Sequence, residues 1–383
     1  MKLGFDSKRL FCNSTGLGNY SRTLLQNLGN YYPDHEYFLY TPEIRHIADT
    51  SVFLENSVYK TRTPDTYLKS FWRTWSIKNQ LKSDKIALFH GLSNEIPLNI
   101  DKINDKINIK SIVSIHDLIF KVYPDTYKKI DRTIYDIKFR YACNHADRII
   151  AISENTKKDI ASFYRIDPIK IEVIYQACSP HYYQLKDQEQ NNLVINQYHL
   201  PTEFLLSVGS VEARKNLKSV IASYRYLNKS LQIPLVVIGK GGKYKLEVEQ
   251  LVLEAGLAKK VIWISNLTNN EHLQSIYQSS QVLIYPSFYE GFGLPVAEAL
   301  LCKTPVITAN RSSLMEAGGP GSVYIDPDSP EQIAGAIETV LTNSQQRKRI
   351  IESGYDYAHQ TFAPERVTRQ MIECYQTIIG SGV

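Results

Sequence analysis

Two glutamates, Glu290 and Glu298, stand eight positions apart in the segment YPSFYEGFGLPVAEALLCKTPVITA at 285–309. Glycines lie between them, and Pro295 marks the expected start of a helix. Glycines let backbone N–H groups approach a ligand, and a helix N-terminus adds partial positive charge, so the loop is suited to phosphate. The candidate N–H groups are those of Phe292, Gly293 and Leu294. A phosphate site with a carboxylate on each side suits a sugar nucleotide, because ribose and hexose both offer hydroxyl groups.

Two adjacent cations lie at a second candidate turn, in FLLSVGSVEARKNLKSVIASY at 204–224. The pattern predicts a strand, a turn at Gly209 and then a helix that Arg214 and Lys215 open. Fixed cations at such a turn can neutralise a diphosphate leaving group and so take the place of a divalent metal ion. We therefore expect both side chains in the reaction site, and no metal cofactor.

A histidine and an aspartate end a predicted buried strand in SIHDLIFKVYPDTY at 114–127. Ligand-binding residues of open α/β sheets lie at the carboxyl ends of strands, which favours a role for His116 at a reaction site. The alternative is a core histidine that is satisfied by a backbone carbonyl group. We expect Asp117 to orient the loop or His116 rather than to act as a base.

A glycine-rich turn opens the predicted helix GLGNYSRTLLQNL at 16–28. It does not fit the G-x-G-x-x-G dinucleotide pattern, which requires a glycine or alanine at the last position, where this chain has serine. Gly16 and Gly18 are therefore either residues of a simple turn or part of a ligand site. The loop FHGLSNEIPL at 89–98 follows another predicted strand, and Asn94 is a further candidate.

The elements that must position these residues alternate along the chain. Short apolar runs typical of buried parallel strands are each followed by an amphipathic stretch, which predicts an α/β fold of doubly wound sheets. The runs lie at 86–92, 111–117 and 148–153 and, from 204 onward, in FLLSVGS, LVVIGKG, KVIWIS, QVLIYPS and TPVITAN. The polar segment 181–203 interrupts this rhythm. We predict two Rossmann-like domains, 1–190 and 191–361, and a closing helix in 362–383 that packs back toward the first domain.

Composition narrows the class of protein. The 383 residues, 43% of them hydrophobic, are enough for two cores. A net charge of +5, from 44 Lys+Arg and 39 Asp+Glu, is too diffuse to make nucleic acid the expected partner. The five cysteines form no C-x-x-C pair, which favours a reduced, cytoplasmic compartment. We see no signal peptide and no run of the ~18 to 20 apolar residues of a spanning helix, so any membrane contact is expected to be peripheral.

The segment YKTRTPDTYLKSFWRTWSIKNQLKSDK at 59–85 is both basic and aromatic. Its seven basic and two acidic residues give it a charge of +5, equal to that of the whole protein. Its large aromatic residues include Phe71, Trp72 and Trp75. This composition suits an interfacial helix on anionic lipid, at ~1 kcal/mol per cation near the surface. The alternative is a solvated helix face with its aromatic residues in the core.

The string EGFGLPVAE, followed by a KTPVI strand, resembles the E-x7-E signature of family 4 of the retaining glycosyltransferases, which have the two-domain GT-B architecture. The resemblance extends over nearly the whole chain. It implies that Glu290 contacts the transferred sugar, that Glu298 contacts the nucleotide ribose and that Lys215 binds the diphosphate.

The resemblance also includes the HD pair and the glycine-rich turn. It implies that His116 lies near the donor sugar and the reacting centre, and that Gly16 and Gly18 line the site near the donor phosphates and the acceptor. Many members have arginine directly after the turn glycine, where this chain has Ser210. Ser210 stays a candidate donor-binding residue, and Arg214 is the candidate for the second charge.

Asp326 and Asp328 resemble the D-x-D metal site of the other main glycosyltransferase architecture. They follow a predicted strand and precede a predicted helix, so a turn or N-cap role for Asp328 or Ser329 is the simpler interpretation.

The resemblance implies an activity as well as a fold. The C-terminal domain would bind a nucleotide sugar, the N-terminal domain would present the acceptor, and hinge closure would assemble the site. We expect metal-independent, retaining transfer of a hexose, from GDP-mannose first and a UDP-hexose next, to a glycan or lipid-linked oligosaccharide of a bacterial surface polysaccharide. The alternatives are an epimerase or phosphorylase of the same fold, and a catalytically silent sugar-nucleotide-binding module. The expected location is the cytoplasm, including the inner face of the plasma membrane.

Overall fold

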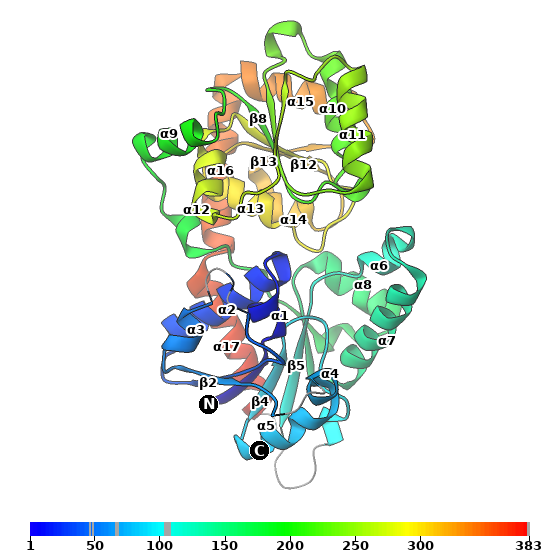
Figure 1. Cartoon of the computed structure of the whole chain (residues 1–383), viewed down its shortest axis with the longest axis vertical. Helices are drawn as coiled ribbons and strands as arrows, with labels where there is room; N and C mark the ends of the chain where they lie inside the picture. The colour runs from blue at the N-terminus through cyan, green and yellow to red at the C-terminus, as the bar shows by residue number, and fades with distance from the viewer. Residues whose placement is uncertain (46, 48–49, 66–68, 103–108, 381–383) are drawn as a thin grey trace. The chain divides into compact units, whose positions relative to one another are not determined.

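The computed structural model describes residues 1–45, 47, 50–65, 69–102 and 109–380. The chain divides into two compact units: unit 1 is Met1–Ala177 with Pro364–Val383, and unit 2 is Cys178–Ala363. Each unit is a parallel sheet with helices on its faces (Figure 1). The boundary predicted at residue 190 falls within α9 (Gln188–Gln197), which belongs to unit 2.

The strands described in unit 1 form one sheet in the order β3-β2-β1-β4-β5-β6-β7, and every pairing in it is parallel. Their bounds are β1 (Lys2–Asp6), β2 (Glu36–Tyr40), β3 (Tyr59–Arg62), β4 (Leu88–Gly91), β5 (Lys110–Ile115), β6 (Arg148–Ala151) and β7 (Ile171–Val173). The order is doubly wound, with its switch point between β1 and β4. The apolar runs predicted β4, β5 and β6 but not β1, β2, β3 and β7. The strand β3, with the sequence YKTR, carries almost no apolar signal.

Helices cover both faces of the unit 1 sheet. They are α1 (Lys8–Cys12), α2 (Gly16–Tyr31), α3 (Val52–Glu55), α4 (Lys69–Phe71), α5 (Ile77–Ser83), α6 (Ile119–Val122), α7 (Lys129–His145), α8 (Glu154–Tyr164) and α17 (Pro364–Gly380). Side chains alternate along each strand, so the sheet has a core on each face. Leu3 and Phe5 pack with α2 and α17, whereas Phe38 and Phe89 pack with α5 and α7.

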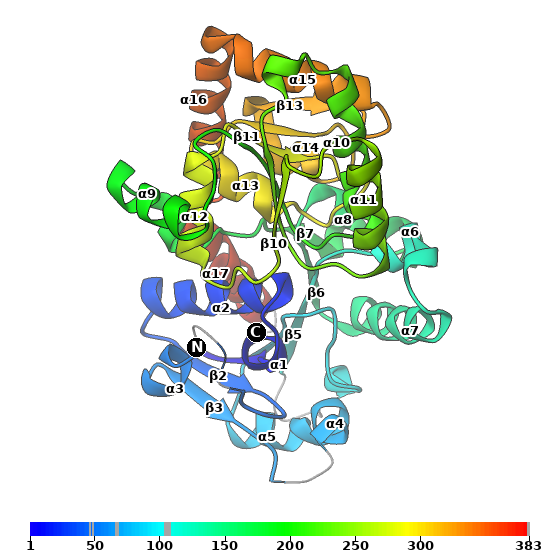
Figure 2. The same cartoon turned by 45° about the horizontal axis from the view of Figure 1, so that its top comes forward.

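The C-terminal helix α17 belongs to unit 1, although it follows unit 2 in the chain. Its apolar residues at helical spacing are all buried there: Val367, Met371, Tyr375 and Ile378. Figure 1 and Figure 2 both show α17 beside α2, in agreement with their contacts. The helix predicted for 362–383 therefore helps to build the core of unit 1.

The basic aromatic segment is not one continuous helix. It begins as the edge strand β3 and continues through α4, the π-helical turn η1 (Trp72–Ser76) and α5, while residues 66–68 lie outside the described residues. Trp72 is buried, whereas Phe71 and Trp75 are 54% and 45% exposed. The segment thus places Tyr59 and Trp72 in the core and leaves Phe71 and Trp75 on the surface.

Unit 2 repeats the doubly wound plan. Among its described strands the order is β10-β9-β8-β11-β12-β13, again all parallel. The strands are β8 (Leu205–Val208), β9 (Leu235–Ile238), β10 (Val261–Ile264), β11 (Val282–Tyr285), β12 (Val306–Ala309) and β13 (Ser322–Ile325). The helices are α9, α10 (Leu217–Ser223), α11 (Lys243–Glu254), α12 (Asn270–Ser279), α13 (Leu294–Leu301), α14 (Leu314–Gly318), α15 (Pro330–Thr342) and α16 (Ser344–Thr361). Figure 2 shows α11 on one side of this sheet and α12 and α13 on the other.

None of the helices in the described part of the chain combines the length and the apolar character that crossing a bilayer requires. All five cysteines are free thiols.

Candidate active site

The candidate donor site of unit 2 forms where β8 and β11 end. These strands are neighbours at the switch point of the sheet, where ligands bind in doubly wound folds. The 3-10 turn η6 (Ala213–Lys215) follows β8, and the glycine loop before α13 follows β11. Asn216 joins the turns: its φ is 58°, and its Nδ2 donates to the carbonyl oxygens of Pro286 at 3.3 Å and Pro327 at 2.7 Å. The EGFG loop therefore lies beside the ARK turn.

Glu290 lies at the centre of an ion cluster with both cations of the ARK turn. Its Oε1 is 2.6 Å from Lys215 Nζ and 2.8 Å from Arg214 Nη1. The Tyr285 hydroxyl donates to the same oxygen at 3.2 Å and accepts from Lys215 Nζ. Arg214 Nη2 also pairs with Glu212 Oε1 at 2.7 Å. The structure thus brings three predicted catalytic residues together. It adds Tyr285 and Glu212, which the sequence motifs did not indicate, although Tyr285 ends a predicted strand.

The cluster is largely shielded from solvent. The side chains of Glu290, Arg214 and Lys215 are 10%, 11% and 16% exposed. Burial alone would raise the pKa of Glu290, but the charges of Lys215 and Arg214 outweigh it and lower that pKa to about 2. Glu290 is therefore ionised at neutral pH, and it is paired with both cations.

The glycine loop is held close to α14 by packing that requires glycine. Gly293 has a φ of 114°, and a Cβ there would lie 2.9 Å from Leu314 Cδ2. Gly293 is also the N-cap of α13 and has no side chain to offer the first N–H groups of that helix. The Ser313 hydroxyl donates hydrogen bonds to the loop: its Oγ lies 2.8 Å from the carbonyl oxygen of Glu290 and 2.9 Å from that of Phe292. Ser313 was also missed, because a serine after β12 gives no distinctive sequence signal.

Phe292 and Leu294, the two other residues predicted to bind phosphate, offer only backbone groups to a ligand. The Phe292 side chain is buried and packs edge to face on Phe362, with ring centroids 5.2 Å apart. Leu294 is the first residue of α13. The backbone N–H groups near the start of α13 are thus the parts of this loop suited to an anion.

Glu298 lies about one turn into α13, in a different environment from Glu290. Its Oε2 accepts a hydrogen bond of 3.1 Å from the Tyr277 hydroxyl. Burial raises the pKa of Glu298 to about 7, although the bond from Tyr277 acts in the opposite direction. The two glutamates of the motif therefore differ: cations hold Glu290 ionised, whereas Glu298 titrates near neutral pH.

Ser210 lies next to the ion cluster. Its hydroxyl donates to Glu212 Oε1 at 2.8 Å, and the same oxygen pairs with Arg214. The preceding Gly209 has a φ of 130°. A small hollow of about 10 Å³ is lined in part by Gly209, Ser210, Lys215 and Tyr285. The serine thus takes part in the cluster indirectly, and Arg214 supplies the cation there.

In unit 1, His116 follows β5 and is buried. One ring nitrogen, Nε2, is 2.8 Å from the Leu92 carbonyl oxygen. The backbone N–H of His116 donates to Asn94 Oδ1 at 2.9 Å. Because a carbonyl oxygen can only accept, Nε2 carries the proton and Nδ1 carries the lone pair. Burial lowers the pKa of His116 to about 4, so the imidazole is neutral at pH 7. Asp117 Oδ1 accepts from the Ile119 N–H at 3.0 Å and so orders the loop.

The two glycines of the first loop have different surroundings. A Cβ at Gly18 would lie 1.8 Å from the Asn13 carbonyl oxygen, so close backbone packing requires glycine there. A Cβ at Gly16 would have no atom within 4 Å. Packing therefore requires glycine at position 18, whereas at position 16, the start of α2, there is space for a side chain.

The D-x-D pair is engaged in ion pairs. Arg311 Nη2 is 2.6 Å from Asp326 Oδ1 and 2.7 Å from Asp328 Oδ2. Ser329 is the N-cap of α15, and its hydroxyl oxygen accepts from the Gln332 N–H at 3.3 Å. Within the described ranges, no three or more His, Cys, Asp or Glu side chains are grouped so that they could hold a metal ion.

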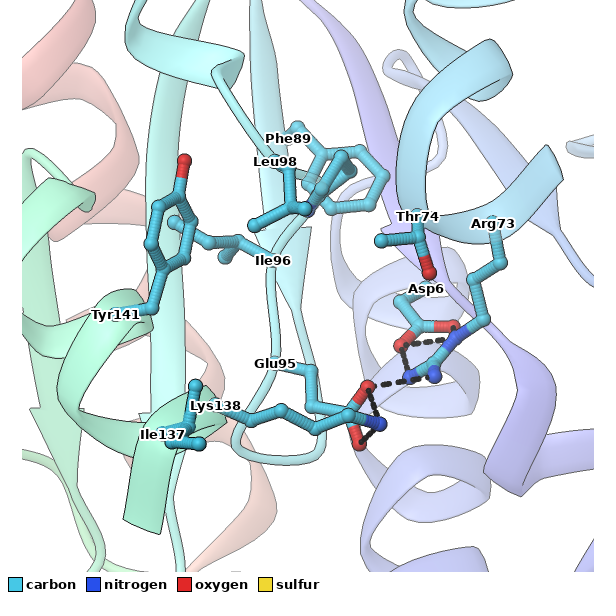
Figure 3. Close-up of a pocket in the computed structure, with 11 residues that line it drawn as sticks. Asp6, Arg73, Thr74, Phe89, Glu95, Ile96, Leu98, Ile137, Lys138 and Tyr141 are labelled. Carbon is cyan, nitrogen blue, oxygen red and sulfur yellow. Dashed lines mark hydrogen bonds and ion pairs between the residues drawn. The ribbon is translucent and has the colours of Figure 1, made fainter. Parts of the chain in front are cut away.

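Unit 1 also contains a pocket of about 210 Å³ between η1 and α7 (Figure 3). Most of its walls are apolar: Phe89, Ile96, Pro97, Leu98, Ile137 and Tyr141. Figure 3 shows ion pairs along one side, where Arg73 Nη1 is 2.8 Å from Glu95 and Arg73 Nε donates to Asp6 at 3.1 Å. Lys138 Nζ lies 3.3 Å from Glu95. The sequence did not indicate this pocket.

Both halves of the chain match family models of glycosyltransferases. Residues 14–181 match the model described as Glycosyltransferase Family 4, and residues 190–357 match Glycosyl transferases group 1. The O-antigen chain mannosyltransferase B of Escherichia coli is 25% identical over an alignment of 393 positions that covers 99% of this chain and 100% of that protein. The O-antigen chain mannosyltransferase RfbU of Salmonella typhimurium is 27% identical over 228 residues, 60% of each chain.

Solved structures show the same fold. HepE of Anabaena, solved in complex with UDP, matches with a TM-score of 0.77 and 16% identity over 98% of this chain and all of that chain. Sucrose-phosphate synthase of Thermosynechococcus elongatus matches with a TM-score of 0.77 and 18% identity, and both chains are covered completely. Together with the two family models and the two doubly wound units, these matches show that the chain is a glycosyltransferase of the GT-B fold, with a first half that matches the family 4 model and a second half that matches the group 1 model.

Proposed function

We propose that this glycosyltransferase moves a hexose from a nucleoside diphosphate sugar to a glycan or lipid-linked oligosaccharide in the synthesis of a bacterial surface polysaccharide, with retention of configuration and without a metal ion. The ion cluster of Glu290, Lys215 and Arg214 beside the glycine loop is the observation that carries this proposal. GDP-mannose is the first candidate donor, because a relative that covers 99% of this chain is named a mannosyltransferase, as is one that covers 60% of it. A UDP-hexose is the second, because HepE was solved with UDP.

The cluster supports a mechanism in which the leaving diphosphate takes the place of Glu290 beside the cations. Lys215 and Arg214 neutralise the charge that develops on the phosphate oxygen as its bond to the sugar C1 breaks. The acceptor oxygen forms its bond to C1 on the same face, and its proton passes to the departing phosphate oxygen. Glu290, released from the cations, becomes free to accept a hydrogen bond from a sugar hydroxyl.

The experiment is sugar transfer from a panel of GDP-, UDP- and dTDP-sugars in EDTA, with Lys215→Ala compared with Lys218→Ala. Lys218 is a matched control, because it lies three residues away and pairs with the exposed Glu247 at 2.7 Å. Lys215→Ala should lower kcat by roughly 10²–10³, whereas Lys218→Ala should leave it unchanged. Wild-type turnover by Lys215→Ala would overturn the assignment, and strict dependence on Mg²⁺ or Mn²⁺ would overturn the metal-free mechanism.

The same panel separates the alternative functions. An epimerase would convert a nucleotide sugar without an acceptor, and a phosphorylase would require orthophosphate. A silent module would be stabilised thermally by a nucleotide but would turn over no donor. Transfer that depends on a sugar acceptor is the result that the ion cluster leads us to expect.

The apolar pocket of unit 1 supports a lipid-linked acceptor. Its lining includes Asp6 at the end of β1 and Glu95 in the loop after β4, so it lies at the carboxyl edge of the sheet, where His116 also lies. We expect Ile137→Asp to lower kcat/KM for a lipid-linked acceptor more than for the same glycan without lipid. Ile130→Asp is the control, because Ile130 is 74% exposed on the same helix and does not line the pocket. Equal losses for both acceptors would contradict the lipid role.

A peripheral membrane contact through 59–85 is restricted to the exposed part of that segment. Arg73 lies inward, paired with Asp6 and Glu95, so it is not available to lipid. Phe71 and Trp75 stack on the surface with ring centroids 6.5 Å apart, and Lys78 Nζ lies 5.9 Å from the Trp75 ring. Trp75→Ser with Lys78→Glu should reduce co-sedimentation with anionic vesicles but not with neutral ones. Unchanged co-sedimentation would remove this surface from the proposal.

A further inference from the structure

Four buried polar side chains of unit 1 form one continuous hydrogen-bonded chain across four elements. Tyr375 Oη of α17 is 2.7 Å from His90 Nδ1 of β4, and His90 Nε2 is 2.8 Å from Ser114 Oγ of β5. Ser114 Oγ is in turn 2.8 Å from Tyr20 Oη of α2. All four side chains are buried. These hydrogen bonds therefore link the C-terminal helix α17 to α2, the helix that follows the glycine-rich turn.

The hydrogen-bonded chain ends against His116. The Tyr20 ring meets the imidazole edge to face, with centroids 4.6 Å apart and an angle of 88° between the rings. On its other side the imidazole is held by the bond from Nε2 to the Leu92 carbonyl oxygen. A backbone acceptor and an aromatic ring thus fix the imidazole together and set the direction of its Nδ1 lone pair.

Strand alternation explains why these groups meet. Side chains two positions apart in a strand share a face of the sheet, so Ile112, Ser114 and His116 all point toward one face. Ile112 lies in the core that α2 and α17 cover, and Leu88, two residues before His90, lies in it too. Polar residues at His90 and Ser114 therefore stand where the pattern would otherwise place apolar ones.

Two other buried tyrosines of unit 1 are satisfied by backbone groups. The Tyr37 hydroxyl donates to backbone carbonyl groups, including that of Leu28 at 3.0 Å, and the Tyr59 hydroxyl donates to the Leu25 carbonyl oxygen at 2.9 Å. Side chain to side chain hydrogen bonds are the minority class in proteins, and a run of three in a core gives one specific arrangement. A neutral imidazole donates from one nitrogen and accepts at the other, so His90 also gives the run a direction.

We propose that Tyr375, His90, Ser114 and Tyr20 are positioning residues that hold the His116 imidazole in one orientation and couple it to α17. This helix starts at Pro364, where the chain returns from unit 2 to unit 1. A displacement of α17 is transmitted to the imidazole through three hydrogen bonds and one ring contact. The inference rests on the proposed glycosyltransferase function and on the role that the family resemblance implies for His116, near the donor sugar and the reacting centre.

The test is a double-mutant cycle on sugar transfer. Tyr375→Phe removes one hydroxyl and should lower kcat about threefold to tenfold, the worth of one neutral hydrogen bond, with the donor KM unchanged. In the His116→Ala background the same substitution should cost nothing further, because residues that act through one another are not additive. Tyr37→Phe is the matched control: it removes a buried hydroxyl from the same unit and should leave kcat unchanged.

A second readout does not depend on activity. In ¹⁵N spectra of the full-length protein, Tyr375→Phe should shift the imidazole nitrogens of both His90 and His116, whereas Tyr37→Phe should shift neither. An unshifted His116 signal, or an equal loss of kcat in the wild-type and His116→Ala backgrounds, would overturn the positioning role. Should Tyr375→Phe not fold, Ser114→Ala enters the same cycle. Wild-type turnover by His116→Ala would instead refute the proposed role of His116 itself.

Discussion

Replacing Glu290 by glutamine removes the negative charge from the ion cluster and keeps the size and shape of the side chain. In the wild-type protein that charge serves both Lys215 and Arg214, at 2.6 and 2.8 Å. Glu290→Gln leaves two largely buried cations with only Glu212 as a counter-charge near Arg214. The substitution should therefore change stability, nucleotide binding and turnover, and each change has its own direction.

The stability effect can be worked out from the pKa of Glu290. A lowering from 4.5 to about 2 means that the folded protein favours the ionised form by roughly 3 kcal/mol, because one pKa unit is about 1.4 kcal/mol. Removing one partner of a buried ion pair costs a similar ~3–5 kcal/mol. We expect Glu290→Gln to lose about 3 kcal/mol of unfolding free energy at pH 7. The contribution of a carboxyl group with a lowered pKa is present above pH 4.5, so the difference should vanish as the pH falls toward 2.

The effect on binding should have the opposite sign. Lys215 and Arg214 no longer have Glu290 to neutralise, so GDP or UDP meets two cations without its competitor. We expect the nucleoside diphosphate to bind about tenfold more tightly, the worth of one charge-assisted hydrogen bond. Sugar transfer should fall, because a glutamine amide oxygen is a weaker acceptor for the sugar hydroxyl than the carboxylate that we propose contacts it. Tighter product binding with slower turnover is a combination that general destabilisation does not produce.

The assay is urea unfolding at pH 7 with and without nucleotide, together with sugar transfer. Glu212→Gln is the control: Glu212 contacts the same Arg214 but its side chain is 48% exposed, so its loss should cost under about 1 kcal/mol. Weaker nucleotide binding by Glu290→Gln would refute the idea that Glu290 competes with the diphosphate. A stability loss no greater than that of Glu212→Gln would refute the electrostatic account of the cluster.

Three further predictions concern pH and packing. The pKa of Glu298 is raised to about 7, so stability should fall as the pH rises from 4.5 through 7, and Glu298→Gln should flatten that part of the urea-midpoint profile. Burial lowers the pKa of His90 to about 3, so stability should fall as the pH drops below 6.5, less steeply in His90→Asn; an unchanged slope would contradict the burial argument. Gly18→Ala places Cβ 1.8 Å from a carbonyl oxygen and should lower Tm or prevent folding, whereas Gly16→Ala should be tolerated.

The sequence by itself determined the fold class and the segments of the donor site. Apolar runs followed by amphipathic stretches predict doubly wound sheets, because strands buried on both faces must be apolar throughout. The EGFG and ARK segments were found for the same kind of reason: glycines beside a helix start, and cations at a strand-to-helix turn, express their chemistry over a few residues. A local pattern of this kind is visible without knowing what lies across the fold.

Tertiary structure alone decided how these residues are paired and charged. Lys215 meets Glu290 across seventy-five positions in the chain. The charges of Lys215 and Arg214 lower the pKa of Glu290, whereas burial raises the pKa of Glu298 in the same motif. The tertiary structure also placed Arg73 in an internal ion pair and joined Tyr375 to His90 across the core. Charge state and hydrogen bonding depend on which atoms lie within a few ångströms and on how much water is excluded, and chain folding sets both.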